Sequence, residues 1–507
     1  MTQWKHAHPE EVRLSAEILR TLEQAGHEAC WVGGCVRDEL IGRPVNDMDI
    51  ATSARPEEVT ALFERTVPTG IEHGTVTVVL EKRPFEVTTF RTESEYKDFR
   101  RPEEVVFVRS LEEDLRRRDF TMNAIARGLD GRYIDPYDGR GDLARGIIRC
   151  VGDARERFRE DALRMLRGVR FASVFGFGLE PDTWEALLEL RGNMVHIAAE
   201  RIRAELEKML GGPRPEEGLR LLERSALLAE AKIPLPPERL AEAQERGFAS
   251  LGEVPAQPAE LRWAALLARL GVTGEEAERT LKSWTFSGGF AKAAAAVLRI
   301  DARMGAEEAE SGGNGKAGGD AESGEAAAAE QSAAPQAGRR SSPPEEKIGG
   351  GAADSGANRG PQAVRPGAAP EDEAGGAQAE RRLAFVRAVL DFGRTAAESW
   401  LLYRSAADGA DEERAAARSQ AAGWLAAIPA ESPRELALGG TEIAEHLSRA
   451  PGPWLGALIR RLLEAAALGR AANERAALLQ EIARLESEPG TAADSAPPNR
   501  PKEAKPQ

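Results

Sequence analysis

The stretch WVGGCVRDELIGRPVNDMDIATS, residues 31–53, decides the fold of the first part of the chain. Gly33 and Gly34 follow a short apolar run that predicts a strand, and they precede a segment that predicts a helix. Paired glycines at such a junction let the backbone approach a phosphate chain, which then faces the N–H groups of the helix. The pattern is weak by itself, because a glycine pair is more often a plain turn.

The same stretch contains two carboxylates, Asp47 and Asp49, on either side of Met48. On a strand, residues i and i+2 point to the same face, so both carboxylates can hold hard cations side by side. Glu86 lies in a neighbouring predicted strand, FEVTTFR at 85–91, where a charge between apolar residues is costly without a partner. Three such carboxylates suit two Mg²⁺ ions, one activating an attacking hydroxyl and one neutralising a triphosphate as pyrophosphate leaves. The alternatives are a solvated strand edge for the aspartates and a sheet-surface acid for Glu86.

Two arginine-rich motifs follow. In DLRRRDFTMNA, 114–124, three consecutive arginines ending at Arg118 precede a predicted helix cap, and arginine forks bind phosphate bidentately. Asp119 and Asn123 offer acceptors for ribose hydroxyls. In REDALRMLRGVR, 159–170, charged residues recur every three positions, and on one helix they share a face that walls a cleft. These residues are Asp161, Arg164, Arg167 and Arg170. A basic helix start and a solvated helix face are the alternatives.

Outward from these motifs, the first 150 residues mix a helical pattern over 11–25 with strands at Ala29–Val32, Thr75–Leu80 and 85–90. From about 153 the pattern is helical. We therefore predict an α+β protein: a small head with a mixed sheet plus helices, followed by an all-α body that a disordered insert interrupts. The predicted domains are the head at 1–150, a helical neck and body at 151–304, the insert at 305–378, a helical body and tail at 379–487, and a disordered tail at 488–507.

The predicted insert also explains much of the acidity of the chain. The formal charge is −15, and residues 305–378 carry 13 acidic and 6 basic residues with no aromatic residue. Such a composition cannot bury enough apolar surface to offset chain entropy. Because the excess negative charge is concentrated in this segment, the overall charge does not exclude a local basic patch for RNA.

Cysteine usage and hydropathy indicate the compartment. Cys30, Cys35 and Cys150 are scattered without a CxxC pair, which favours reduced thiols over a disulfide framework or a zinc site. No apolar run of about 18 residues and no apolar leader occur, so we expect neither a membrane span nor a signal peptide. These features predict a cytoplasmic protein.

Six motifs occur in order: GGCVRDELIGR…DMD, EVTTFR, RRRDFTMNA, DPYDGRGDL at 135–143, EDALR at 160–164 and ERIRAEL at 200–206. Together they resemble the class II tRNA nucleotidyltransferases, which are the CCA-adding enzymes, and their relatives the bacterial poly(A) polymerases. The resemblance covers about 28–210, and a weaker one covers 436–480; the insert departs from the family pattern. It implies a nucleotidyltransferase head and Mg²⁺-dependent addition of the 3′-terminal CCA to tRNA from CTP and ATP. The sequence leaves the oligomeric state, including a homodimer, open.

The resemblance also implies roles for individual residues. Asp47 and Asp49 would hold Mg²⁺, with Glu86 completing the catalytic carboxylates, while Gly33, Asp119 and Asn123 would support the site. The incoming nucleotide would be bound, and its base read, by Gly34, Arg37, Arg118, Asp161, Arg164, Arg167 and Arg170. A carboxylate only accepts hydrogen bonds and a guanidinium only donates, so Asp161 and Arg164 together match the amino group and ring nitrogen of cytosine or adenine. Guanine and uracil present the reverse order, at about 1–3 kcal/mol per unmade bond.

Four alternatives stay open. A poly(A) polymerase would carry an apolar-plus-basic signature after RRDFT, and nothing in RGLDGRYIDPYDGRGDLARG resembles it. A CC-only enzyme would have a shortened loop where 92–110 looks full length, and an A-only enzyme is a further partial activity. The three carboxylates argue against a catalytically dead RNA-binding module. A transferase acting on a small molecule would not need Asp161, Arg164 or the long helical body.

Overall fold

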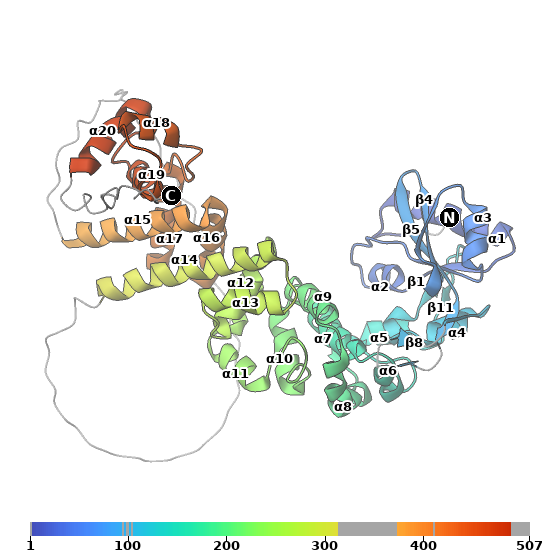
Figure 1. Ribbon diagram of the computed structural model, residues 1–507. Helices are drawn as coiled ribbons and strands as arrows, with labels where there is room; N and C mark the ends of the chain where they lie inside the picture. Colours follow the sequence, from blue (N-terminus) through green and yellow to red (C-terminus); the bar gives the residue numbers. More distant parts are fainter. Residues whose placement is uncertain are drawn as a thin grey trace, which may run out of the picture. The chain divides into compact units, whose positions relative to one another are not determined.

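The computed structural model describes residues 3–93, 96–97, 101–102, 105–312, 373–408 and 411–487 (Figure 1). The chain divides into one compact unit of Met1–Met304 with Arg382–Gln507 and a second unit of Gly305–Arg381. Most of the predicted insert, and the tail predicted at 488–507, lie outside the described residues. Helices α14 (Gly288–Gly312) and α15 (Glu373–Phe392) extend into the two ends of the predicted insert, whose bounds stay a prediction. The two ends of the predicted insert are rich in alanine and glutamate, which favour helix. A helix that packing already stabilises can therefore continue into them.

The head is built on a mixed seven-stranded sheet of order β11-β10-β1-β2-β5-β4-β3. Its central strands β2 and β5 are parallel, whereas β1 pairs antiparallel with both β2 and β10. The mixed sheet that we predicted is confirmed. The strands are β1 Ala29–Val32, β2 Ile50–Thr52, β3 Thr66–Gly70, β4 Thr75–Leu80, β5 Arg83–Thr89, β10 Ala126–Arg127 and β11 Tyr133–Ile134, with short pairs β6 Arg91–Glu93 and β9 Val105–Phe107, and β7 Tyr96–Lys97 and β8 Arg101–Pro102.

Side chains alternate between two apolar clusters on the opposite faces of this sheet, as strand geometry requires. Trp31 and Ile50 join the main core, whereas Cys30, Val32 and Ala51 join a smaller cluster. Helix α1 packs on β1 and buries Leu14, Ile18, Leu19 and Leu22, and its Ser15 Oγ accepts a hydrogen bond from Trp31 Nε1 at 3.0 Å. The helices of the head are α1 Pro9–Gln24, α2 Gly34–Leu40, α3 Pro56–Leu62, η1 Ile71–His73, α4 Leu111–Arg116, η2 Thr121–Asn123 and α5 Gly139–Arg145.

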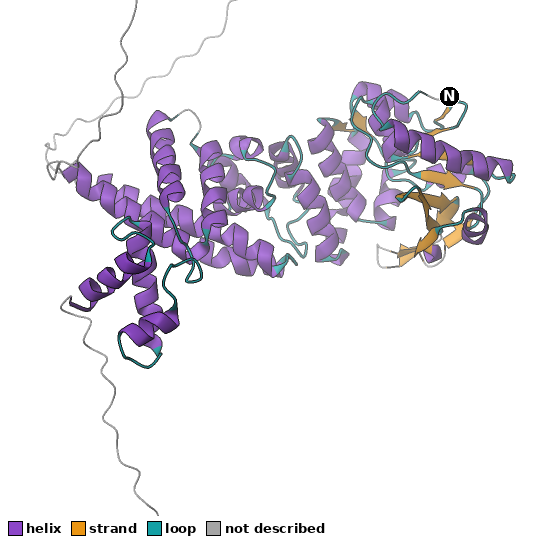
Figure 2. Cartoon of the chain, turned by 90° about the horizontal axis from the view of Figure 1, so that it is seen from above, coloured by secondary structure: helices purple, strands orange, loops and turns teal. Residues whose placement is uncertain are grey.

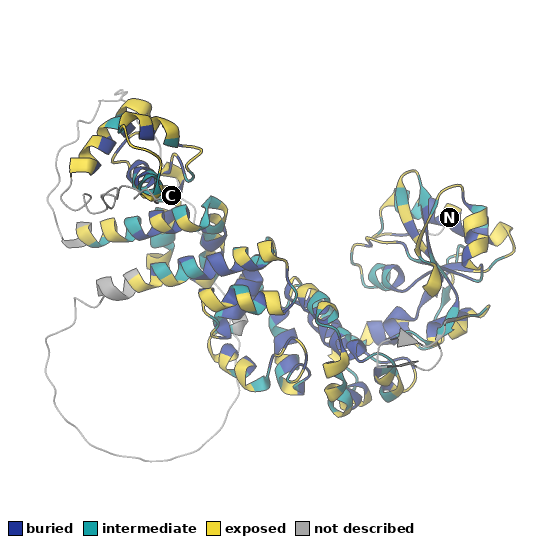
Figure 3. Cartoon of the chain, viewed as in Figure 1, coloured by how far each residue is buried: buried dark blue, intermediate teal, exposed yellow. Residues whose placement is uncertain are grey.

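The described residues from Ala154 onward form helices and their connecting loops (Figure 2). The exception is β13 (Gly178–Leu179), which pairs in parallel with β12 (Ile147–Ile148). Buried and exposed residues alternate around these helices, which is the amphipathic pattern that the sequence predicted (Figure 3). The helices are α6 Ala154–Glu160, α7 Leu163–Phe175, α8 Pro181–Leu190, η3 Arg191–His196, α9 Ala199–Leu210, α10 Pro215–Ser225, α11 Pro237–Glu245, η4 Phe248–Glu253, α12 Glu260–Arg269, α13 Gly274–Ser283, α14, α15, α16 Arg394–Ala407, α17 Glu412–Ala427, α18 Gly440–His446, α19 Pro453–Ala467 and α20 Arg475–Ser487.

Two further features concern the helical part. A separate small core links the tail helices through Ile443, Leu462 and Ile482.

Among the described residues, none of the helices combines the length and apolarity needed to cross a membrane.

Candidate active site

The three predicted carboxylates, Asp47, Asp49 and Glu86, form what we call the acidic cluster. The two aspartates precede β2, which begins only at Ile50, so they do not lie within the strand as expected. Asp49 nevertheless lies beside β1, because Val32 N donates to Asp49 O at 3.1 Å. The parallel register of β2 and β5 pairs Ile50 with Val87, which places Asp49 beside Glu86.

The acidic cluster holds like charges together. The pKa of Asp49 is raised to about 6, first by burial and then by the neighbouring charges of Glu86 and Asp47, while Arg118 and Arg37 partly offset the rise. Within the described parts of the chain, none of the three carboxylates forms an ion pair. Nor do three or more His, Cys, Asp or Glu side chains there form a preassembled metal site. No described cation therefore pairs directly with the cluster, and its hard oxygen donors fit a divalent cation.

Gly33 joins β1 to α2 and lies directly against an arginine. Its φ is +74°, and a Cβ atom at this position would lie 2.9 Å from Arg118 Nη1. The positive φ therefore favours glycine, and a side chain at this position would displace the guanidinium of Arg118. The buried carboxylate of Asp114 lies 3.1 Å from Arg118 Nη2 and holds Arg118 next to Gly33. Burial alone would raise the pKa of Asp114, but Arg118 and Arg117 hold it below its usual range.

Arg37, in the first turns of α2, is fixed from several sides. Its Nη1 donates to Asn123 Oδ1 at 2.6 Å, and its Nε donates to Asp38 Oδ1 at 3.0 Å. The guanidinium also lies over the rings of Phe171 and Phe175, at 5.3 and 4.9 Å from their centroids. Such a side chain loses little further freedom when it binds an anion.

Asp119 and Asn123 extend this network into α7. Asp119 Oδ1 accepts from Asn123 Nδ2 at 2.9 Å, and Asp119 Oδ2 accepts from Arg167 Nε at 2.8 Å. Burial alone would raise the pKa of Asp119, but Arg167 and Asn123 hold it well below its usual range. Arg167 also lies 3.8 Å from Glu205 of α9, which accepts a hydrogen bond from the buried Arg170. The predicted acceptors for ribose are thus largely engaged by protein groups.

The expectation that Asp161 shares one helix with the three arginines is wrong. Helix α6 ends at Glu160 and α7 begins at Leu163, so Asp161 lies in the break with a φ of −142°. There its Oδ1 accepts from Leu163 N at 3.1 Å, which satisfies one of the free N–H groups at the start of α7. Only Arg164, Arg167 and Arg170 lie on α7.

Sequence reasoning missed the partners of these residues. Glu160 accepts from Arg164, Arg201 binds Asp161, and Glu205 binds Arg170. Arg201 and Glu205 lie in the ERIRAEL motif. Residues four positions apart lie on the same face of a helix, so the motif could have predicted that these two side chains point to one partner surface. What the motif could not show is that this face packs on α7.

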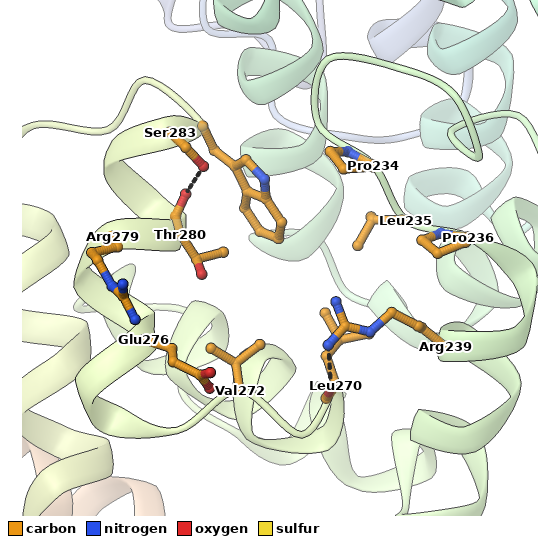
Figure 4. Close-up of a pocket in the computed structure, with 11 residues that line it drawn as sticks. Pro234, Leu235, Pro236, Arg239, Leu270, Val272, Glu276, Arg279, Thr280 and Ser283 are labelled. Atoms are coloured by element: carbon orange, nitrogen blue, oxygen red, sulfur yellow. Dashed lines mark hydrogen bonds between the residues drawn. The ribbon is translucent and has the colours of Figure 1, made fainter.

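A cavity of about 410 Å³ lies elsewhere, in the helical body between α11 and α13 (Figure 4). Arg239, Arg279 and Trp284 line it, and Arg239 Nη2 donates to Leu270 O at 3.4 Å. None of the candidate site residues lines this cavity, so the geometry of the head carries the functional argument.

Comparisons with known proteins agree with the geometry of the head. The family model "Poly A polymerase head domain" matches residues 29–149. The model "Probable RNA and SrmB- binding site of polymerase A" matches 176–232, and a model of domain 2 of tRNA nucleotidyltransferases matches 396–482.

Two curated relatives and one solved structure are especially similar. The CCA-adding enzyme of Geobacillus stearothermophilus is 49% identical over 281 residues, which are 55% of this chain and 68% of that enzyme. The CCA-adding enzyme of Lactiplantibacillus plantarum is 48% identical over 280 residues, with 55% and 68% covered. The crystal structure of the Bacillus stearothermophilus CCA-adding enzyme in complex with CTP superposes with a TM-score of 0.68 at 33% identity, covering 94% of this chain and 99% of that one. Sequence, head geometry and fold agree, and the chain belongs to the family of CCA-adding enzymes, the tRNA nucleotidyltransferases.

Proposed function

We propose that this enzyme builds and repairs the 3′-terminal CCA of tRNA from CTP and ATP without a nucleic-acid template, and that the acidic cluster is its catalytic centre. Family membership supports the reaction. The observation that carries the assignment of the centre is that Asp49 lies beside Glu86 and that none of the three carboxylates forms an ion pair among the described residues. The pKa of Asp49, raised to about 6, agrees with it. Strongly perturbed carboxylates in such a position are typical of catalytic centres.

Nucleotidyltransferases of this family generally use a divalent metal, and we assign Mg²⁺ to Asp47 and Asp49. Mg²⁺ commonly binds through one or two carboxylates together with substrate phosphates, which fits a cluster without a third preassembled ligand. A bound Mg²⁺ would neutralise the triphosphate and favour ionisation of the attacking 3′-hydroxyl. Glu86, opposite Asp49 across the strand pair, adds negative charge that strengthens cation binding.

The triphosphate is assigned to the junction between β1 and α2. Gly33 and Gly34 present backbone without side chains, and a Cβ atom at Gly34 would lie 3.7 Å from Arg37 Nη2. Arg37 and Arg118 are both held close to this backbone by neighbouring acceptors. Two fixed guanidinium groups beside the acidic cluster can hold phosphate oxygens while the α-phosphorus faces the attacking hydroxyl.

Base selection is assigned to Asp161 and Arg164 at the junction of α6 and α7. Asp161 can accept from the amino group of cytosine or adenine, and Arg164 can donate to the adjacent ring nitrogen. Arg167 and Arg170 support this pair through Asp119 and Glu205. The tRNA acceptor end must reach the same site, and the helical body is proposed to hold the rest of the tRNA by shape and phosphate contacts.

Two further assignments concern the cellular context. Cys30, Cys35 and Cys150 are free and buried, which fits a reducing compartment, so we propose a cytoplasmic location. A homodimer stays a prediction, which sedimentation velocity of the purified full-length chain tests directly.

The decisive experiment supplies the purified chain with tRNA transcripts that lack the final three nucleotides, together with Mg²⁺ and each nucleotide alone or combined. CTP alone should add two residues, ATP alone should add none, and both together should give CCA and stop. A long tail from ATP alone would indicate a poly(A) polymerase, and arrest after CC despite ATP would indicate a CC-only enzyme. Sequencing the 3′ ends distinguishes these outcomes.

A further inference from the structure

The carboxylate of Asp161 accepts three hydrogen bonds from protein donors. Arg201 Nη2 donates to Oδ2 at 2.7 Å and Nη1 donates to Oδ1 at 3.3 Å, while Leu163 N donates to Oδ1 at 3.1 Å. Arg201 comes from α9, 40 residues further along the chain. The resulting fork of two N–H groups on two oxygens is the strongest form of this ion pair.

Arg164 is occupied in the same way. Its Nη1 contacts Glu160 Oε2 and donates to Arg157 O at 3.3 Å, and its Nη2 donates to Arg117 O at 3.0 Å. Among the described contacts, Arg164 N donates to the backbone O of Asp161 at 3.0 Å, but no contact joins the two side chains. Both groups assigned to base reading are therefore engaged by protein partners when no nucleotide is bound.

We propose that Arg201 is a positioning residue that holds the carboxylate of Asp161 until an incoming cytosine or adenine displaces it. The inference rests on the proposed role of Asp161 as base reader. The guanidinium donates to the same oxygens that the exocyclic amino group of either base would use, so it stands in for that group when no nucleotide is bound. Displacement is feasible because the pair is partly solvated: the side chains of Arg201 and Asp161 are 28% and 17% exposed.

This arrangement makes nucleotide binding a competition. Cytosine and adenine offer an amino donor in exchange for the guanidinium, so the carboxylate never lacks a partner. Uracil and guanine offer a carbonyl oxygen there, and displacement would leave an acceptor facing an acceptor. After bond formation the return of Arg201 to Asp161 releases the base, which each further addition requires. Arg201 therefore lowers the affinity for the correct nucleotides while it speeds their turnover.

The test compares Arg201→Ala with the wild type in two measurements on the full chain. Equilibrium dialysis with labelled CTP, ATP and UTP, without tRNA, gives the affinities. The Kd values for CTP and ATP should fall about tenfold, on the order of one charge-assisted hydrogen bond, and the Kd for UTP should not change. In multiple-turnover assays of Arg201→Ala with tRNA lacking its 3′ end, the KM for CTP and ATP should fall. The kcat should fall as well, because Arg201 no longer helps to release the base.

Arg203→Ala is the matched control, because Arg203 lies on the same helix but contacts Thr285 and Phe286 instead of Asp161. It should leave the ratio of CTP to UTP affinity unchanged. Arg201→Lys retains a cation without the two-pronged contact and should give an intermediate gain in affinity. It also provides a second variant if Arg201→Ala folds poorly, which circular dichroism and thermal melting reveal.

Weaker or unchanged binding of CTP by folded Arg201 variants would overturn the inference, since Arg201 would then merely support Asp161. Asp161→Ala distinguishes this failure from a failure of the proposed function. If Asp161→Ala loses the preference for CTP over UTP and the Arg201 variants gain no affinity, only the inference is wrong. If Asp161→Ala keeps the preference, Asp161 is not the base reader, and the assignment on which the inference rests is wrong as well.

Discussion

The acidic cluster and the arginines of α7 are both dense in charge, yet they are neutralised in opposite ways. The acidic cluster has no ion-pair partner among the described residues, and the pKa of Asp49 rises to about 6 as a consequence of burial and like charge. On α7 every arginine of the motif contacts a carboxylate: Glu160 for Arg164, Asp119 for Arg167 and Glu205 for Arg170. Carboxylates without an ion-pair partner, and not dense charge alone, thus indicate where an external cation belongs.

The largest effect should follow from removing a charge at the acidic cluster. Asp49→Asn or Asp47→Asn should lower the rate of nucleotide addition by about 1000-fold or more, since a lost metal ligand removes several kcal/mol of transition-state stabilisation. Single-turnover addition of CMP to tRNA measures it. Glu112→Gln, an exposed acid on α4, is the control and should keep the wild-type rate. Near-normal addition by either aspartate variant would remove the acidic cluster from the mechanism.

The next largest effect should appear as lost stability in the α7 network. Asp119→Ala leaves the guanidinium of Arg167 without its main partner and should lower the free energy of unfolding by about 3–5 kcal/mol. The low pKa of Asp119 means that its contribution is present above about pH 4 and is lost as pH falls below that value. Urea unfolding followed by circular dichroism measures both effects.

An exposed acid provides the comparison for Asp119. Glu189 pairs with Arg155, but its side chain is 49% exposed, so Glu189→Ala should cost less than about 1 kcal/mol. Equal losses for Glu189→Ala and Asp119→Ala would mean that the buried network contributes no more than a surface pair.

Arg164→Ala should have an intermediate effect that concerns choice of base as well as rate. Loss of the donor to the ring nitrogen should reduce correct incorporation by roughly 10–200-fold, on the order of 1–3 kcal/mol. Incorporation of uridine should increase, because no donor then clashes at that position. Sequencing of products made with all four nucleoside triphosphates measures it. Products that still end only in CCA at near wild-type rate would make Arg164 a purely structural arginine.

The smallest effect concerns the response of stability to pH and Mg²⁺. Because the pKa of Asp49 is about 6 instead of 3.8, metal-free protein should lose about 1–2 kcal/mol of stability as pH rises from about 4 through 6. Mg²⁺ at pH 7.5 should restore a similar amount. Asp49→Asn should abolish both responses in urea unfolding with EDTA or Mg²⁺, and an unchanged response in that variant would place the cation elsewhere.

Much of the head could be predicted from local patterns. The strands at Ala29–Val32 and Thr75–Leu80 are confirmed at their predicted bounds, and the helix predicted over 11–25 is α1 at Pro9–Gln24. The prediction of one continuous helix over 159–170 was wrong, because Asp161 and Ala162 break it. The periodicity of charges continues across the break, so a pattern of side chains alone could not reveal it.

The sequence by itself determined the order of motifs, the change from a mixed sheet to helices near residue 150, and the residue types at each candidate position. These depend on neighbours within one strand or one helical turn. Only the tertiary structure decided which charges are paired: Arg167 with Asp119 across 48 residues, and Arg201 with Asp161 across 40. The first pair joins α7 to the loop after α4, and the second joins α9 to the break before α7. Contacts between segments so far apart leave no periodic trace in the sequence.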